Sequence, residues 1–240
     1  MRLNVSMYGT RDAASNWEDK YASHLIACGF TQGKSSPCIF FHKERGIRCV
    51  VHGDDFTFLG NDEGLDFATT IMKEEYDIKL RGRLGPEKGD QKSITILNRC
   101  VEWRQDGIYY EADPRHAEII VKEMGVASMA PVVTPGVKTS ALPEEDDPLL
   151  DHEHAHKFRR VIARGNFLCQ DRTDIQYATK ETARGMANPR QSHWDRLVRL
   201  AKYLKGRMRY VIKFGKQTGV YSINTYGDSD VAGEVEARKS

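Results

Sequence analysis

Two adjacent carboxylates, Asp54 and Asp55, give the sequence its clearest chemical signal. They follow His52 and Gly53 at a polar break between two apolar runs, a pattern that predicts a β-hairpin with both carboxylates at its tight turn. Two such neighbours repel each other, and a hard divalent cation, Mg²⁺ or Mn²⁺, would offset that repulsion through carboxylate oxygens. A metal pair there could activate a 3′-hydroxyl and stabilise a leaving pyrophosphate. The simpler alternative is an Asp-rich turn without metal, because Asp favours turns anyway.

A basic segment lies further along the chain. The formal net charge is only +2, yet eleven Lys and Arg residues and only two acids lie between Lys180 and Lys216. Within it, Arg196, Arg199 and Lys202 are spaced three apart, and Lys205 follows at the same interval. On a helix they could meet phosphates of a nucleic acid without reading its sequence. The alternative is a solvated helix face.

The histidines and cysteines give weaker signals. His152, His154 and His156 alternate in a way that could ligate a transition metal. They fall in a linker rich in Pro and acidic residues, which favours an exposed, unstructured cluster. The five cysteines are scattered without C-x-x-C spacing, which favours reduced thiols in an intracellular setting and no zinc site.

The periodicity predicts an α+β fold, and no apolar run is long enough to suggest a membrane partner. Asp113 and Pro114 form a helix start, with the helix ending near Gly125. A second hairpin is expected around Asp106-Gly107. Other helices are expected at 17–27, 64–76, 158–169, 174–186 and 192–203, strands at 39–41, 93–103, 108–110, 210–214 and 221–226, a loop at 81–90, and a linker with four prolines at 127–148.

Several segments resemble copia-type retrotransposon Pol polyproteins. Residues 8–17, with Tyr8, Gly9 and Trp17, resemble the Y-G-L-K-Q-A-P-R-x-W segment of copia-type reverse transcriptases. His52-Gly53-Asp54-Asp55 falls where that family has Y-V-D-D. The other similar segments, in chain order, are Cys28-Gly29-Phe30, Ser36-Pro37-Cys38-Ile39-Phe40, Gly60-Asn61, Thr134-Pro135, Arg172-Thr173-Asp174-Ile175-Gln176-Tyr177-Ala178, Asn188-Pro189, His193-Trp194, Tyr203-Leu204-Lys205-Gly206, Gly227-Asp228-Ser229-Asp230-Val231-Ala232-Gly233 and Arg238-Lys239-Ser240.

The resemblance implies part of a right-hand polymerase palm, made of an antiparallel sheet plus helices, then a helical thumb or connection region and a truncated ribonuclease H-like strand. The expected regions are 1–126 for palm and first thumb helix, 127–157 for the linker, 158–218 for thumb or connection, and 219–240 for the start of the ribonuclease H-like domain. Asp54 and Asp55 would be two of three polymerase carboxylates, and Asp228 would match the first ribonuclease H carboxylate. His52 and Gly53 depart from the family's tyrosine and hydrophobic residue.

The implied function is RNA-directed DNA synthesis with Mg²⁺ or Mn²⁺, on a template-primer duplex of RNA or DNA with deoxynucleotides, inside a larger Pol polyprotein. The family's first catalytic aspartate precedes the Tyr8 segment, so no residue here takes that role, and we expect the chain alone not to polymerise. An intracellular location is expected, in a cytoplasmic virus-like particle or the nucleus. A non-enzymatic nucleic-acid-binding remnant of a transposon is the alternative.

Overall fold

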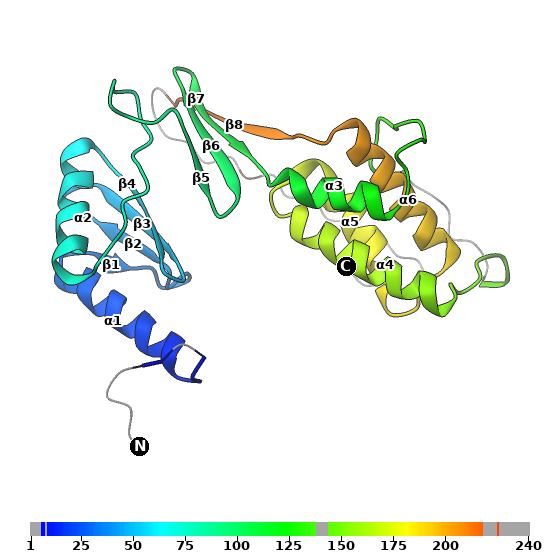
Figure 1. Cartoon of the computed structure of the whole chain (residues 1–240), viewed down its shortest axis with the longest axis horizontal. Coiled ribbons are helices and arrows are strands. Elements are labelled where there is room, and N and C mark those ends of the chain that lie inside the picture. The colour runs from blue at the N-terminus through cyan, green and yellow to red at the C-terminus, as the bar shows by residue number, and fades with distance from the viewer. Residues whose placement is uncertain (1–5, 8, 138–143, 218–224, 226–240) are drawn as a thin grey trace. The chain divides into compact units, whose positions relative to one another are not determined.

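The computed structural model describes residues 6–7, 9–137, 144–217 and 225 and confirms an α+β protein, with two four-stranded antiparallel sheets and six α-helices among those residues (Figure 1). The chain divides into two compact units between Arg81 and Gly82, a boundary that falls inside the region predicted as palm and first thumb helix. Within the described residues no helix is long and apolar enough to cross a membrane.

The first unit packs two helices against one face of a sheet. Its strands run in the spatial order β1 to β4, and each alternates between the two faces. Ile47, Cys49 and Val51 of β3 point inward and are buried with Leu25 of α1 and Met72 of α2. The elements are α1 (Ala13–Ala27), β1 (Thr31–Gln32), β2 (Ile39–His42), β3 (Ile47–His52), β4 (Asp55–Leu59) and α2 (Asp62–Glu75).

The hairpin predicted across Asp54-Asp55 is confirmed as β3 and β4. Both helices begin earlier than their apolar spacing indicated, α1 at Ala13 and α2 at Asp62. For α2 the cause is a cap, since the Asn61 side chain accepts a hydrogen bond from the Gly64 N–H at 2.9 Å. The short strand β1 was not predicted.

The second unit contains the other sheet, formed by β5 (Ser93–Ile96), β6 (Arg99–Arg104), β7 (Gly107–Glu111) and β8 (Val211–Gly215) in that order. The hairpin near Asp106-Gly107 is confirmed, as is the strand expected at 210–214. The prediction of one continuous strand over 93–103 is wrong. Leu97 and Asn98 both have positive φ, 48° and 65°, and form a tight turn that separates β5 from β6.

Four helices complete the second unit: α3 (Pro114–Glu123), α4 (His152–Leu168), α5 (Gln176–Ala183) and α6 (Gln191–Gly206). Asp113 caps α3 as predicted, accepting from the Arg115 N–H at 3.0 Å. The predicted start of α4 at 158 is wrong, because Asp151 accepts from the His154 N–H at 2.8 Å and nucleates a helix from His152. The helix expected at 174–186 is shorter, with a 3₁₀ turn at each end, Thr173–Ile175 and Arg184–Met186.

The core of the second unit lies among these helices. Phe158 and Ile162 of α4 are fully buried against Ile120 of α3 and against Leu197 and Leu200 of α6. On α6, Leu197, Ala201 and Leu204 are buried, while Trp194 and Val198 are partly buried beside them. Within the predicted linker, Glu144–Asp146 form a 3₁₀ turn.

Candidate functional site

The turn between β3 and β4 presents the two predicted carboxylates side by side. His52 pairs with Asp55 across the hairpin, so Gly53 and Asp54 form a two-residue loop. Gly53 has φ +63°, a conformation that glycine adopts without steric cost. Asp54 is exposed at the tip, and Asp55, the first residue of β4, is partly buried. Gly53 stands where the Pol family has a hydrophobic residue, and the positive φ at this position explains why the turn carries glycine.

Trp17 of α1 contacts this turn directly. Its indole N–H donates a hydrogen bond to the Gly53 carbonyl at 2.8 Å. Its ring packs edge-on against Tyr21, Phe56 and Tyr76, with centroids 5.7, 6.2 and 5.4 Å away. The sequence singled out Trp17 only as a motif residue, and the structure gives that residue a direct contact with the carboxylate turn.

Arg81 was missed by the sequence reading, which placed it in a charged loop. Its guanidinium lies 3.2 Å from the Asp55 carboxylate. The Arg81 side chain is 71% exposed and that of Asp55 is 40% exposed, so water reaches and screens the pair. The Arg81 guanidinium is therefore paired with one of the two carboxylates that the metal hypothesis requires.

The metal-binding capacity of the described residues is limited. Among them no group of three or more His, Cys, Asp or Glu side chains is placed to hold a metal ion. Asp54 and Asp55 could therefore supply two ligands, with the rest coming from water, substrate phosphates or chain outside the described residues.

The predicted basic residues on α6 do not form an open cationic face. Arg196, Arg199, Lys202 and Lys205 are each only partly exposed. The Arg199 guanidinium donates to the Thr134 hydroxyl at 2.8 Å. The Lys205 ammonium donates to the backbone carbonyls of Ala127 and Met129, each at 2.6 Å. Part of the predicted linker therefore lies against this side of the helix.

Two of the motifs that resemble the Pol family meet inside the second unit. Arg172 is 1% exposed and forms a two-pronged ion pair with Asp174, at 2.8 and 2.7 Å. Tyr203 of α6 donates from its hydroxyl to the same carboxylate at 2.9 Å. These residues tie α6 to the segment that precedes α5, which gives them a structural role.

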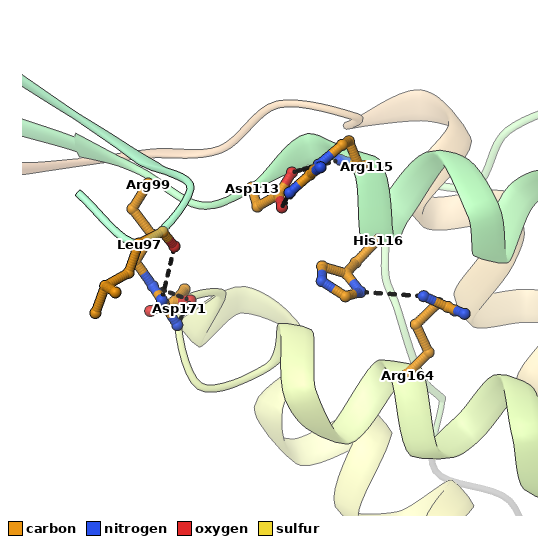
Figure 2. A network of polar contacts seen from close by, with 7 residues as sticks. All are labelled: Leu97, Arg99, Asp113, Arg115, His116, Arg164 and Asp171. Carbon is orange, nitrogen blue, oxygen red and sulfur yellow. Dashed lines mark hydrogen bonds and ion pairs between the residues drawn. The ribbon is translucent and has the colours of Figure 1, made fainter. Parts of the chain in front are cut away.

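A second polar network joins the sheet to the helices (Figure 2). Asp171 accepts from Arg99 of β6 at 2.8 Å and from the Tyr110 hydroxyl of β7 at 2.6 Å. His116 of α3 faces Arg164 of α4, with 3.4 Å between its Nδ1 and the guanidinium (Figure 2). Burial, together with nearby cations that include Arg164, lowers the pKa of His116. The Arg164 Nε is buried without a hydrogen-bond partner among the described residues, and the residues around Asp171 and His116 enclose a cavity of only about 40 Å³.

The alternating histidines lie on the first turns of α4, so the expectation of an unstructured cluster is wrong. His152, His154 and His156 are all exposed, as expected. His154 Nδ1 lies 2.8 Å from the Asp151 carboxylate, and its ring packs edge-on against Trp194. His154 is therefore part of the helix start rather than a ligand shared with its neighbours.

Three predictions near the termini have different outcomes. Gly9 has φ +86°, in a turn just before α1. Tyr8 and Asp228 lie outside the described residues. Of the strand expected at 221–226, only Thr225 is described, so that strand stays a prediction.

No protein-family model matches the chain, and no solved structure matches it. Three curated proteins are similar over nearly all of it. The retrovirus-related Pol polyprotein from transposon TNT 1-94 of Nicotiana tabacum is 25% identical over 249 residues, covering 100% of this chain and 18% of the relative. Those from transposons RE2 and RE1 of Arabidopsis thaliana are 24% and 23% identical, covering 98% and 97% of this chain. The chain spans less than a fifth of the length of these relatives, 18%, 16% and 15%.

Proposed function

We propose that this chain, a homologue of the retrovirus-related Pol polyproteins of copia-type plant transposons, supplies two carboxylates to the metal site of an RNA-directed DNA polymerase. The carboxylates are Asp54 and Asp55, and the single observation that carries the proposal is their presentation together on a tight turn held by Trp17. The first unit would then be part of the polymerase palm, and the helices of the second unit part of a thumb or connection region.

The electrostatics of the turn support metal binding. Asp54 is exposed, and its neighbour Asp55 begins the adjacent strand, so their charges repel. Arg81 offsets only part of that repulsion, because an exposed ion pair of this kind contributes about 0–1 kcal/mol. A divalent cation carries twice the charge and prefers carboxylate oxygens, so it can displace the guanidinium.

The proposal assigns separate roles to the two carboxylates and to Trp17. Asp54 and Asp55 would hold Mg²⁺ or Mn²⁺, which when bound activates the primer 3′-hydroxyl and stabilises the leaving pyrophosphate. Trp17 fixes the Gly53 carbonyl and with it the direction in which the carboxylates point. A third carboxylate would come from chain outside these 240 residues, in the rest of the polyprotein. We therefore propose that the chain alone does not extend a primer.

The partners and setting follow from the same proposal. Template-primer duplex and deoxynucleotides would be the substrates, with the remainder of Pol as the covalent partner, inside a cytoplasmic virus-like particle or the nucleus. Asp228 would open the ribonuclease H-like region. The basic side of α6 carries four cations, Arg196, Arg199, Lys202 and Lys205, which makes metal-independent nucleic-acid binding a second candidate function.

Binding of Mn²⁺ to the 240-residue chain, followed by electron paramagnetic resonance, tests the metal site. We expect weak binding, with a Kd on the order of millimolar because only two carboxylates contribute, and competition by Mg²⁺. Asp54→Asn and Asp55→Asn should each remove it. Asp19→Asn is the matched control, since it deletes one exposed carboxylate on α1 and should leave binding intact.

Equal Mn²⁺ binding by the wild type and Asp54→Asn would contradict the proposed site. Magnesium-dependent primer extension by the isolated chain would contradict the need for a third carboxylate. Duplex binding that falls steeply with salt, and that survives both Asp54→Ala and chelation, would favour the second candidate.

A further inference from the structure

Residues 127–137, which we call the strap, lie along the basic side of α6. They contact the helix at three places: Lys205 donates to the carbonyls of Ala127 and Met129, Arg199 donates to the Thr134 hydroxyl, and Pro131 packs on Gly206. A Cβ added at Gly206 would lie 2.9 Å from the Pro131 Cβ, closer than real contacts allow. The strap therefore approaches the helix closely because position 206 has no side chain.

The strap offers Arg199 and Lys205 no negatively charged partner. It contains no charged residue, so Arg199 and Lys205 receive only neutral acceptors from it, a hydroxyl and two carbonyls. The Arg199 Nε is buried and has no hydrogen-bond partner within the described part of the chain. A buried donor without an acceptor costs about 1–3 kcal/mol, more when it is charged. The face beneath the strap is thus short of acceptors and of negative charge.

The middle of the strap is weakly held, while its surroundings are firmly anchored. Val126, just before it, is fully buried in the helical core. Beyond it, Asp147 is buried and accepts from the Ser192 N–H and hydroxyl at 2.8 and 2.7 Å. Val133 between these anchors is 85% exposed, while Val132 packs against the core and Gly136 lies close to Ala178 of α5. Lifting the strap would expose little apolar surface, so its release costs little hydrophobic free energy.

We propose that the strap is a displaceable cover over a phosphate-binding face of α6, and that a nucleic-acid backbone takes its place on Arg199 and Lys205. The inference rests on the nucleic-acid binding in the proposed function. It adds that the strap controls access of nucleic acid to the basic side of α6. A phosphate oxygen is a charged acceptor, and charge-assisted hydrogen bonds are roughly twice as strong as neutral ones.

Two substitutions outside the cationic face loosen the strap. Gly206→Ala pushes Pro131 away, and Thr134→Val removes the hydroxyl that accepts from Arg199. The double variant is compared with Gly215→Ala, whose new methyl group would meet nothing within 4 Å. Thermolysin cleavage before Val132 and Val133, mapped by mass spectrometry, reports strap release. Binding to a primer-template duplex from 50 to 200 mM salt reports the phosphate contacts.

We expect the double variant to be cleaved faster at the strap and to bind the duplex more tightly at low salt. Because the duplex displaces the strap in the wild type as well, both proteins make the same phosphate contacts when bound. Their log-log salt slopes should therefore agree, and the double variant should keep its tighter binding from 50 to 200 mM salt. Because coupling is reciprocal, duplex should also accelerate strap cleavage in the wild type. The control should match the wild type throughout.

Three results would overturn the proposal. The first is faster strap cleavage with an unchanged duplex affinity, which leaves nucleic-acid binding standing and removes only the cover. The second is a strap that the double variant fails to loosen, which makes it a fixed part of the unit. The third is the absence of duplex binding in every variant, which also removes the nucleic-acid part of the proposed function, while Mn²⁺ binding at Asp54 still decides the metal part separately.

Discussion

The indole N–H of Trp17 donates a hydrogen bond to the Gly53 carbonyl, which joins the first helix to a turn 36 residues further along the chain. The two residues belong to different segments of the Pol resemblance, and their contact places the aromatic cluster of Trp17, Tyr21 and Phe56 directly behind the carboxylate pair. The orientation of the turn is therefore set by packing in the first unit and by one directional hydrogen bond.

Trp17→Phe tests that bond, because it keeps an aromatic ring and removes the donor. We expect a loss of about 0.5–1.5 kcal/mol in the stability of the first unit, the usual net value of one hydrogen bond. Amides of β3 and β4 should exchange faster with deuterium, and Mn²⁺ binding at Asp54 should weaken. Trp103→Phe is a matched change in the second unit and should alter neither amide exchange in β3 and β4 nor Mn²⁺ binding. Equal effects from both variants would show that loss of ring volume, and not loss of the hydrogen bond, causes them.

The buried Arg172–Asp174 pair predicts a larger effect in the second unit. Arg172→Met leaves the Asp174 carboxylate with too few partners, which we expect to cost about 3–5 kcal/mol. Tyr203→Phe removes one hydrogen bond to that carboxylate and should cost about 1 kcal/mol. Urea unfolding followed by tertiary signals of the second unit measures both. Arg160→Met is the control, because its ion pair with Glu123 is more exposed and should contribute at most about 1 kcal/mol.

Local signals were sufficient for much of the fold. The Asp113-Pro114 start of α3, the hairpin with Asp54 at its tip and the existence of α6 all follow from caps, turn residues and periodicity, which act over a few residues. The start of α4 was missed because an apolar pattern begins later than the Asp151 cap that nucleates the helix.

Contacts between distant residues were beyond the sequence reading. β8 pairs with β7 across roughly a hundred residues of chain, and no local pattern encodes that partner. The same holds for Arg81 beside Asp55 and for the strap against Arg199, since charge spacing shows which side chains share a helix face but not what covers it. The hairpin that carries Asp54 and Asp55 was therefore predictable, and the side chains that contact it were not.

His116 makes the stability of the second unit depend on pH. Burial, then the cations Arg164, Arg115 and Arg99, lower its pKa below the ordinary value of 6.5, while Asp113 opposes them. The unfolded chain then binds the proton more readily, so this contribution is fully present above pH 6.5 and is lost as pH falls through the folded pKa. Unfolding free energies from pH 4 to 8 should show the slope. His116→Gln should flatten it, whereas the exposed control His156→Gln should not.

The turn between β5 and β6 carries a local strain that substitution can relieve. Leu97 has φ 48°, and a branched aliphatic residue gains no local hydrogen bond there. Asn tolerates this conformation, so Leu97→Asn should raise the stability of the second unit by about 0.5–1 kcal/mol. Thermal unfolding measures the gain. Asn98→Val should act in the opposite direction, because φ is 65° at that position, and a loss of stability in Leu97→Asn would show that the Leu97 side chain contributes more by packing than its backbone costs.

In the proposed metal site Arg81 would compete with the cation for Asp55, so we expect its removal to strengthen metal binding. Arg81→Gln deletes the cation 3.2 Å from the carboxylate and leaves two negative charges for a divalent ion. We expect Mn²⁺ affinity to rise about two- to fivefold, since an exposed pair of this kind contributes up to about 1 kcal/mol. Lys79→Gln is the control, because it makes the same change in net charge on an exposed residue of the same unit, for which no contact with Asp55 is seen. Titration of both variants with Mn²⁺ measures the change in affinity. An equal rise in affinity in both variants would show that net charge alone causes it. A lower affinity in Arg81→Gln would show that the guanidinium orders the turn and does not block the metal site.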